Sequence, residues 1–359
     1  MSRLDELIQK YCPNGVEYKK LEELSNISIG EFVHKNKQNK NGKYPVYNGG
    51  KENTGFYDEY NNIGKKIIIS ARGANAGYVN KVLTNYWSGN SCYTLNIKDN
   101  KCINWLYLYY FLKKQENNLI KNQQSGSIPA LSKKQLGQVL IPLPPRPIQE
   151  EIVRILDSFT KLNEKLNEEL TKRKNQYEYY RDNLLSFKDK SIYLPLEQIL
   201  KIKNGKDYKH LNIGKIPVYG TGGIITYVDK YTYNKPSVLI PRKGSLEKLY
   251  YLDTPFWNVD TVFYTEIFNN VVEKYVFYCL QKEHLEKLNT AGGVPSLTQR
   301  VLNKVRIPVP SLDKQKYIVS ILDKFNILCN DLLPAEIEAR KKQYEYYRDK
   351  LLTFKELKQ

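Results

Sequence analysis

The feature that most constrains this chain is a long internal duplication. The segment RKNQYEYYRDNLLSFK at Arg173–Lys188 recurs as RKKQYEYYRDKLLTFK at Arg340–Lys355. Upstream of it, IPLPPRPIQEEIVRILDSF at Ile141–Phe159 matches IPVPSLDKQKYIVSILDKF at Ile307–Phe325. The copies lie almost half the chain apart, far beyond the roughly 20 to 50 residues of solenoid repeats. The chain therefore consists of two copies of one domain-sized unit.

Each copy has a nearly constant part and, before it, a more variable part. The match reaches back to Ser125–Pro144, which resembles Ala291–Pro310. Only short motifs survive further upstream: YPVYNGG resembles IPVYGTGG, IIISARG resembles VLIPRKG, and Trp87 corresponds to Trp257. We therefore expect both variable parts to be globular and built on one plan.

The positive charge of the chain is concentrated in the variable parts. The formal net charge of +18 divides into +10 for residues 1–147 and +6 for residues 191–310, with zero for 148–190 and +2 for 311–359. A biased genome composition alone would not spare two segments, so the distribution indicates a polyanionic partner. An anionic membrane surface is the weaker alternative, because the sequence shows no basic amphipathic helix with a bulky apolar face.

The constant parts are predicted to be long helices. Apolar residues recur at alternating steps of three and four, as in a heptad seam with one stutter. The first stripe consists of Ile152, Ile155, Phe159, Leu162, Leu166, Leu170, Tyr177, Tyr180, Leu184 and Phe187. The second consists of Ile318, Ile321, Phe325, Leu328, Leu332, Ile337, Tyr344, Tyr347, Leu351 and Phe354. A proline disrupts a helix, so we expect a kink or a new helix start near Asn330–Pro334.

A stripe of about 38 residues, roughly 57 Å at 1.5 Å per residue, requires a partner. Pairing of the two helices within one chain is favoured. An antiparallel pair would place the globular parts at opposite ends, related by a pseudo-two-fold axis. Two alternatives stay open: each helix covers its own globular part, or the seam forms a homodimer.

The YEYYRD motifs lie at the ends of these stripes. We interpret their first tyrosine as a seam residue, and their arginine as paired with the glutamate of the motif or with a partner subunit. These residues are Tyr177, Glu178 and Arg181 in the first copy and Tyr344, Glu345 and Arg348 in the second.

The variable parts have the pattern of mixed α/β domains. Short apolar runs bounded by glycine-containing turns predict buried strands, and longer runs predict helices. The expected strands are Ile67–Ser70, Tyr93–Ile97, Val238–Ile240 and Val262–Thr265, and the expected helices are Ile103–Leu112 and Val271–Leu288. Prolines that cannot extend a helix mark the exits: Pro142, Pro144, Pro145 and Pro147, then Pro308 and Pro310.

The predicted fold class is α+β, with two mixed α/β domains separated by two long antiparallel coiled-coil-like helices in a pseudo-two-fold duplication. The boundaries are 1–145 for the first domain, 146–190 for the first helix, 191–310 for the second domain and 311–359 for the second helix.

The sequence carries no recognisable catalytic or metal-binding motif. Leu143–Arg146 does not match an amine-methylation motif, and the Gly-Lys pair at 50–51 is followed by Glu52, which cannot supply the hydroxyl of a phosphate-binding loop. Five scattered cysteines and three histidines favour reduced thiols and no metal site. Without a long apolar run or a secretory signal, a cytoplasmic location is expected.

The duplication, the paired YEYYRD-x-LL-[ST]-F ends and the IPxP junctions before the helices resemble the specificity subunits of Type I restriction-modification systems. The opening, LDELIQKYCPNGVEYKKLEEL at Leu4–Leu24, is also similar to members of that family. The resemblance covers nearly the whole chain. Its helical motifs are specific, whereas the globular parts match loosely, as expected where members bind different sequences.

The resemblance implies two target-recognition domains that each read one half of a bipartite site on double-stranded DNA, with the helices fixing the gap. The two domains differ, so the site should be asymmetric. Two methylation subunits would dock on the helices and use S-adenosylmethionine to methylate an adenine in each half-site. Restriction subunits would use ATP and magnesium to translocate and cleave DNA. The specificity subunit itself would hold no cofactor and no catalytic residue.

Candidate DNA contacts lie in polar loops. Arginine and lysine bind phosphates or guanine edges, asparagine suits adenine, and aromatic rings pack on sugars or bases. The candidates are Lys35, Lys37, Tyr47, Asn48, Arg72 and Asn75 in the first domain, and Lys206, Tyr219, Thr221, Arg242 and Lys243 in the second. Gln123, Gln124 and Ser125 are weaker candidates. An ordinary solvated loop residue is an equally good interpretation of each. Trp87 and Trp257 are expected in the core.

Other functions are compatible with the same pattern. The main alternative is a helical spacer that presents two protein-interaction modules without DNA recognition. A specificity subunit held in reserve for recombination would have the same sequence features. A fused nuclease and methyltransferase would need a longer chain and the missing motifs. A steep loss of binding with salt would distinguish DNA recognition from a protein-interaction role.

Overall fold

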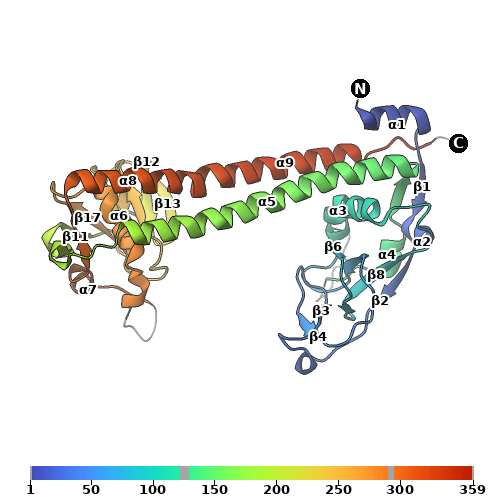
Figure 1. Ribbon diagram of the computed structural model, residues 1–359, viewed down its shortest axis with the longest axis horizontal. Helices are drawn as coiled ribbons and strands as arrows, with labels where there is room; N and C mark the ends of the chain where they lie inside the picture. The colour runs from blue at the N-terminus through green and yellow to red at the C-terminus, as the bar shows by residue number, and fades with distance from the viewer. Residues whose placement is uncertain (1, 122–128, 290–294, 358–359) are drawn as a thin grey trace. The chain divides into compact units, whose positions relative to one another are not determined.

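The computed structural model describes residues 2–121, 129–289 and 295–357. The chain divides into two compact units. Unit 1 comprises Met1–Lys165 and Ile337–Gln359, and unit 2 comprises Leu166–Glu336. Each unit therefore contains one globular head and a part of both long helices (Figure 1). Within the described ranges, no helix has the length and apolar character of a membrane span.

The head of unit 1 contains two small sheets and a two-stranded ribbon. The larger sheet has the antiparallel order β2-β8-β5-β6, and in the smaller sheet β4-β3-β7 the last pair is parallel. The ribbon pairs β1 with β9. The strands are β1 (Glu17–Lys20), β2 (Ser25–Ile29), β3 (Tyr44–Tyr47), β4 (Gly55–Tyr57), β5 (Lys66–Ser70), β6 (Val79–Val82), β7 (Trp87–Ser88), β8 (Cys92–Ile97) and β9 (Leu140–Leu143).

The head of unit 2 repeats this topology strand for strand. Its sheets have the orders β11-β17-β14-β15 and β13-β12-β16, and its ribbon pairs β10 with β18. The strands are β10 (Tyr193–Pro195), β11 (Leu200–Asn204), β12 (Ile213–Gly220), β13 (Gly223–Val228), β14 (Ser237–Pro241), β15 (Tyr250–Leu252), β16 (Trp257–Asn258), β17 (Val262–Ile267) and β18 (Arg306–Pro308). All four predicted strands are confirmed, as β5, β8, β14 and β17.

Short helices complete the heads. Those of unit 1 are α1 (Arg3–Tyr11), α2 (Leu21–Leu24), η1 (Lys35–Lys37), α3 (Trp105–Lys121) and α4 (Lys133–Gly137). Those of unit 2 are η2 (Lys190–Ile192), η3 (Leu196–Gln198), α6 (Glu273–Lys282), η4 (Leu285–Leu288) and α7 (Gln299–Asn303). Capping side chains start several of them; the Ser132 hydroxyl, for example, accepts from the Gln135 amide at 3.1 Å.

The predicted helix Val271–Leu288 was wrong as a single element. The α-helix ends at Lys282, and His284 adopts a left-handed backbone conformation with φ of 49° before the 3₁₀ turn η4 begins. An α-helix cannot continue through a left-handed residue. By contrast, α3 continues well beyond the predicted Leu112.

The central strand of each head is apolar throughout because it is buried on both faces. Ile67 and Ile69 of β5 pack in the core that α3 covers, whereas Ile68 faces a small cluster with Val82 and Tyr86. In β14, Leu239 likewise points away from its neighbours and into a second cluster. Successive side chains of a strand point to opposite faces, so a continuous apolar run requires two cores.

The constant parts form long helices. The first is α5 (Arg146–Leu184), which has 39 residues. The second comprises α8 (Leu312–Ile327), a π-helical turn η5 (Leu328–Leu332) and α9 (Leu333–Leu351). The break predicted near Asn330–Pro334 is confirmed, because the α-helical hydrogen-bond pattern stops at Ile327 and restarts at Leu333. Pro147 lies in the first turn of α5, where no intrahelical donor is needed, so the helix begins within the proline run that was expected to mark the exit from the first globular part.

The helices contact each other in both units. In unit 1, the Phe159 ring of α5 stacks on Tyr347 of α9, with centroids 5.5 Å apart. In unit 2, Tyr180 of α5 stacks on Phe325 of α8 at 5.4 Å. Phe159 and Phe325 are equivalent in the duplication, as are Tyr180 and Tyr347. One contact is thus made twice, with the two copies exchanging roles.

The predicted seam is only partly buried. Ile152, Ile318 and Tyr177 lie in the cores of their units, as expected. Leu162 and Leu332 are 39 % and 59 % exposed, so their placement in a continuous seam was wrong. A straight helix of 3.6 residues per turn drifts away from a 3.5-residue repeat, and the π turn at Leu328–Leu332 changes the helical phase there.

Candidate DNA interface

Three loops of unit 1 meet at the ends of β3 and β5. They are the loop after β3, the loop after β5 and the segment just before α4, which we call the third loop. The amide of Gly73 donates to Pro129 O at 2.9 Å, and the amide of Leu131 donates to Ala71 O at 2.9 Å. The loop after β3 lies against them, because a Cβ on Gly49 would stand 3.1 Å from Arg72 O. Gly49 and Gly73 have φ of 82° and 87°, which favours glycine at both turns.

Unit 2 builds the same junction from different residues. The Gly244 amide donates to Pro295 O at 3.1 Å, and the Leu297 amide donates to Arg242 O at 2.9 Å. These bonds make Gly244 the counterpart of Gly73, and Lys243 the counterpart of Arg72. The ungapped alignment of IIISARG with VLIPRKG gives the same correspondence. Arg242 corresponds to the buried Ala71.

This alignment of the two junctions shows which of the candidate cations face solvent at equivalent positions. Arg72 and Lys243 are exposed, at equivalent positions beside the third loop. Arg242 is half-buried, and its guanidinium lies 5.7 Å from the centroid of the Phe263 ring, a packing contact within the head. The pair best placed to meet a phosphate or a base is therefore Arg72 and Lys243, one in each head.

The two predicted tyrosines are also equivalent. Tyr47 O accepts from the Gly89 amide at 2.8 Å, and Tyr219 O accepts from the Val259 amide at 3.0 Å. Each half-buried ring packs on another tyrosine, Tyr47 on Tyr86 at 6.0 Å and Tyr219 on Tyr250 at 5.5 Å. Burial raises the pKa of both hydroxyls above the usual range, so they stay protonated and can donate hydrogen bonds.

Asn48, Asn75 and Thr221 also lie in these loops. Asn48 Oδ1 accepts from the Ser91 amide at 3.1 Å, so its carbonyl organises the junction. Asn75 is half-buried, and its backbone carbonyl accepts from the Tyr78 amide at 2.9 Å. Thr221 O accepts from the Tyr250 hydroxyl at 3.1 Å. The structure brings Asn48, Tyr47 and Arg72 together in unit 1, and Tyr219, Thr221 and Lys243 in unit 2.

The remaining candidates lie elsewhere in the heads. Lys35 and Lys37 are exposed on η1, between β2 and β3. Lys206 is exposed, and its carbonyl accepts the Trp257 indole N–H at 2.9 Å. The Trp87 indole makes the equivalent bond to Glu31 O at 2.8 Å. Lys206 is therefore the counterpart of Glu31. The weaker candidates Gln123, Gln124 and Ser125 lie outside the described residues.

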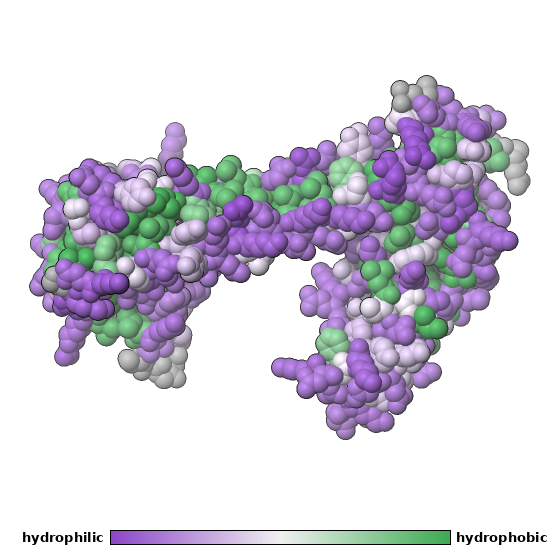
Figure 2. All heavy atoms as spheres, in the orientation of Figure 1, coloured by the Kyte–Doolittle hydropathy of each residue, from purple (hydrophilic) through white to green (hydrophobic). Residues whose placement is uncertain are grey.

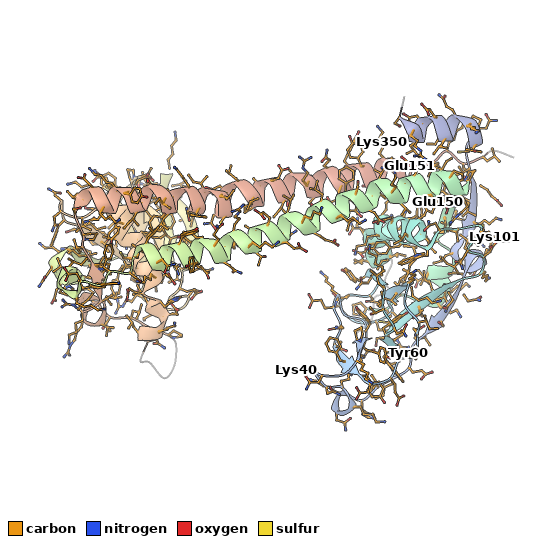
Figure 3. The ribbon with its side chains drawn as sticks, in the orientation of Figure 1. Lys40, Tyr60, Lys101, Glu150, Glu151 and Lys350 are labelled. Carbon is orange, nitrogen blue, oxygen red and sulfur yellow. The ribbon has the colours of Figure 1, made fainter. Side chains whose placement is uncertain are left out.

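The tryptophans anchor these loops. Trp257 is buried, as expected, whereas Trp87 is only half-buried and packs edge-on against Tyr57 at 5.1 Å. Further polar groups that sequence analysis missed extend the surface along β3 and β4. Lys40 is exposed, and Tyr60 packs on Tyr44 at 4.9 Å (Figure 3). Figure 2 shows a mostly hydrophilic face over this region. The lysine-rich run before β3 was the available signal for Lys40.

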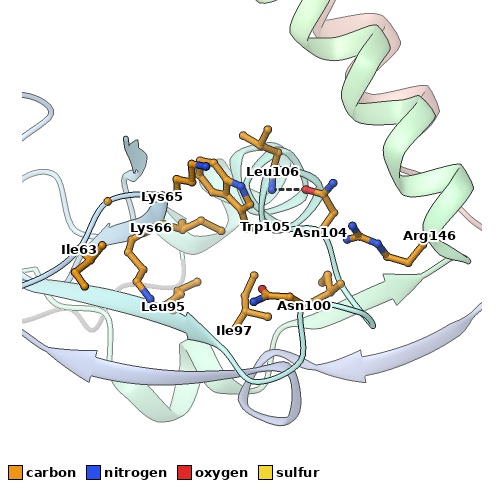
Figure 4. A pocket seen from close by; sticks show the side chains of 13 residues that line it. Ile63, Lys65, Lys66, Leu95, Ile97, Asn100, Asn104, Trp105, Leu106 and Arg146 are labelled. Atoms are coloured by element: carbon orange, nitrogen blue, oxygen red, sulfur yellow. Dashed lines mark hydrogen bonds between the residues drawn. The ribbon is translucent and has the colours of Figure 1, made fainter. Parts of the chain in front are cut away.

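A pocket of about 590 Å³ lies on the other side of the first head, between the start of β5 and α3 (Figure 4). Lys65, Lys66, Trp105 and Arg146 line it. The Lys66 ammonium is bonded to Asn96 Oδ1 at 2.7 Å, and Arg146 pairs with Glu150 at 3.0 Å. Each of these two cations thus has a polar partner of its own. The described residues contain no cluster of three or more metal-ligating side chains.

The sequence matches the family described as Type I restriction modification DNA specificity domain over residues 13–172 and 189–339. The chain belongs to this family of specificity subunits. A putative type I restriction enzyme specificity subunit of Haemophilus influenzae is 31% identical over 94% of this chain and 96% of its own length. The EcoR124I/EcoR124II specificity subunit of Escherichia coli is 33% identical over 71% of this chain and 72% of its own.

Solved structures share the fold. The S subunit of a Type I restriction-modification system from M. genitalium has a TM-score of 0.66 and 23% identity, with 94% of this chain and 96% of that chain covered. Specificity subunits of Type I systems are non-catalytic and confer recognition of DNA sequence. The two matched segments each contain one head, so both junctions belong to DNA specificity domains.

The YEYYRD motifs of this specificity subunit are structural at the tyrosines that we placed in the seam. Tyr177 is buried, and Tyr344 packs against the core of unit 1. The expected glutamate partner of the arginines was wrong: Arg181 and Arg348 pair with the aspartates next to them, each at 2.9 Å. Each guanidinium also lies 5.8 Å from the centroid of the seam tyrosine one turn earlier.

Proposed function

We propose that this specificity subunit reads an asymmetric bipartite site on double-stranded DNA, one half with each head. The observation that carries the proposal is the duplicated loop junction. Its backbone hydrogen bonds are the same in both heads, and so is the tyrosine at Tyr47 and Tyr219, whereas the side chains beside it differ: Asn48 and Arg72 in one head, and Thr221 and Lys243 in the other. A constant frame that displays different donors is suited to recognising two different base sequences.

The long helices would act as a rigid spacer between the half-sites. Support comes from the exchanged contacts, in which the late part of each helix packs on the early part of the other: Tyr347 on Phe159, and Tyr180 on Phe325. Such reciprocal contacts fit an antiparallel, coiled-coil-like pair with pseudo-two-fold symmetry. A rigid spacer makes the second half-site contact intramolecular, so two weak contacts give one strong one.

Two methylation subunits would dock on this pair of helices. Support comes from two equivalent exposed tyrosines, Tyr179 and Tyr346, which are 66 % and 62 % exposed and pack edge-on against Tyr180 and Tyr347. Equivalent surfaces suit two copies of one partner. S-adenosylmethionine would bind to the methylation subunits, and ATP and magnesium to restriction subunits. This chain would be the non-catalytic subunit of that adenine-N6 methyltransferase and ATP-dependent endonuclease.

The decisive experiment is co-expression of the chain with the neighbouring methylation subunit, followed by genome-wide mapping of N6-methyladenine. We expect one asymmetric bipartite motif with a single spacer length. Methylation that lacks a bipartite motif, or is independent of this chain, would refute the proposal. The alternative role as a protein-interaction spacer predicts no steep salt dependence of DNA binding, whereas each phosphate contact adds about −0.9 to the slope of log K against log salt.

The first variants to measure are Arg72→Ala and Lys243→Ala. Loss of a base contact should cost about 1–3 kcal/mol and relax specificity at one position, whereas loss of a phosphate contact should weaken all sequences equally and reduce the salt slope by about 1. Arg242→Ala is the matched control in unit 2. Its guanidinium packs on Phe263, so it should change stability more than site preference. Unchanged binding by both loop variants would remove these cations from the interface.

A further inference from the structure

In each head, one lysine is hydrogen-bonded to the end of the helix of the other copy. In unit 1, Lys114 of α3 donates to Asp349 O at 3.1 Å, Leu352 O at 3.2 Å and Thr353 Oγ1 at 2.6 Å. These groups lie at the C-terminal end of α9. The last carbonyls of a helix lack intrahelical partners and carry partial negative charge, so an ammonium group is matched to them in charge and in hydrogen bonding.

Unit 2 contains the same attachment with the copies exchanged. Lys282, at the end of α6, donates to Leu185 O at 3.0 Å and to Ser186 Oγ at 2.9 Å, just beyond the end of α5. Lys114 and Lys282 are equivalent positions of the two heads, and Leu185 and Leu352 are equivalent positions of the two helices. The attachment is therefore a repeated feature of the fold.

Each head is also fastened to the helix of its own copy. The Tyr110 hydroxyl of α3 bonds to Asp157 of α5, and Tyr278 of α6 bonds to Asp323 of α8. A head held by one helix alone could pivot about that attachment. Attachment to two different helices fixes its angle, because rotation about either contact would break the other.

We propose that Lys114 and Lys282 are positioning residues that hold each head at a fixed angle to the helices and so determine which spacer length the protein accepts. The inference rests on the proposed function. Along a lever as long as α3, which has 17 residues and spans roughly 25 Å, a pivot of about 8° moves the far end by about 3.5 Å. That distance is about the rise of one base pair, so a small loss of angular restraint changes the accepted spacing.

The test is the methylation rate on duplexes that carry both wild-type half-sites with spacers changed in steps of one base pair. The double variant Lys114→Met, Lys282→Met keeps the apolar stems and removes the donors. We expect its preference for the best spacer over the neighbouring spacers to fall by about tenfold, the effect of losing a charged hydrogen bond. Its tolerance of base changes inside each half-site should stay as in the wild type. Lys114→Arg, which keeps a charged donor, should restore part of the preference.

The matched controls are Lys121→Met and Lys287→Met, at exposed positions in α3 and in η4 beyond α6. They should keep the wild-type spacer profile. A double variant that melts like the wild type and keeps its spacer preference would overturn the inference and leave the proposed function intact. A wild-type protein without bipartite methylation would instead refute the proposed function. If the double variant does not fold, the same profiles of the single variants decide, because each loosens one head.

Discussion

Replacement of Gln149 by leucine tests how the first head is joined to the long helix. Gln149 lies in the first turns of α5 and is 1% exposed. Its Oε1 accepts from the Asn104 amide at 2.8 Å, and its Nε2 donates to Cys102 O at 3.0 Å and to Pro144 O at 2.8 Å. Leucine has a similar size and a good helix propensity, so the variant removes three hydrogen bonds with little change in shape.

The expected loss follows from the groups left without partners. A buried polar group without a hydrogen bond costs about 1–3 kcal/mol. Two of the three bonds are only half-buried and water can partly replace them, so we expect a loss of about 3–4 kcal/mol in the free energy of unfolding. For a unit of this size each kcal/mol corresponds to roughly 2–4 °C, which gives a decrease in Tm of roughly 6–16 °C.

Differential scanning calorimetry of the full chain measures this effect. Gln9→Leu, at an exposed position of α1, is the matched control and should melt like the wild type. Gln315→Leu is the counterpart in unit 2. Its side chain accepts from the Val272 amide and donates to Pro310 O, both at 2.8 Å, so its loss should be about two thirds as large. A Gln149→Leu variant that melts within about 2 °C of the Gln9→Leu control would refute the reasoning.

Two further predictions concern the loop junctions. Gly30→Ala and Gly205→Ala should each prevent folding of one head, detected by limited proteolysis, because the new Cβ would lie 2.1 Å from a backbone carbonyl oxygen; a native digestion pattern would contradict this. Burial raises the pKa of Cys92 to about 11 from 9.0, so its stabilising effect is complete below pH 9 and is lost as the pH rises towards 11. The wild type should therefore lose roughly 2–3 kcal/mol more than Cys92→Ala between pH 8 and pH 11 in urea denaturation, and parallel pH profiles would contradict the assignment.

The sequence predicted the elements whose burial is local. The apolar runs at Ile67–Ser70 and Val238–Ile240 could be identified because a central strand covered on both faces needs no alternation. The two-residue strands β7 and β16 could not, since each exists only through parallel pairing with β3 or β12. The helix break near Pro334 follows from proline chemistry, whereas the left-handed His284 has no signal in a run of helix-forming residues.

The candidate site could be predicted in part. The equal-length motifs IIISARG and VLIPRKG align Arg72 with Lys243, and the hydrogen bonds of Gly73 and Gly244 give the same alignment. The sequence did not show which of the adjacent cations Arg242 and Lys243 faces solvent, because that depends on how the backbone pairs with the segment before α7. The half-buried Arg242 corresponds to Ala71, a residue type that gives no sign of the packing on Phe263.

The exchanged helix contacts lead to one more prediction, for a chain that consists of residues 1–188 alone. In the full chain the core of unit 1 includes Leu352 and contacts Leu351 and Phe354, which come from the second copy. The half-chain lacks these residues but still carries their counterparts, Leu184, Leu185 and Phe187. In a dimer, each half-chain can supply the core residues that the other lacks. A single half-chain cannot do so, because its one long helix would have to take the place of both helices of the full chain. We therefore expect light scattering at micromolar concentration to show a dimer. Two copies of a Phe159–Tyr180 contact would replace the Phe159–Tyr347 and Tyr180–Phe325 stacks of the full chain. Phe159→Ala should shift this half-chain towards monomer or unfolded chain, and Tyr179→Ala, at an exposed position of the same motif, is the control. A stable folded monomer would show that each head carries a complete core of its own, and would remove the basis for a rod shared between the two copies.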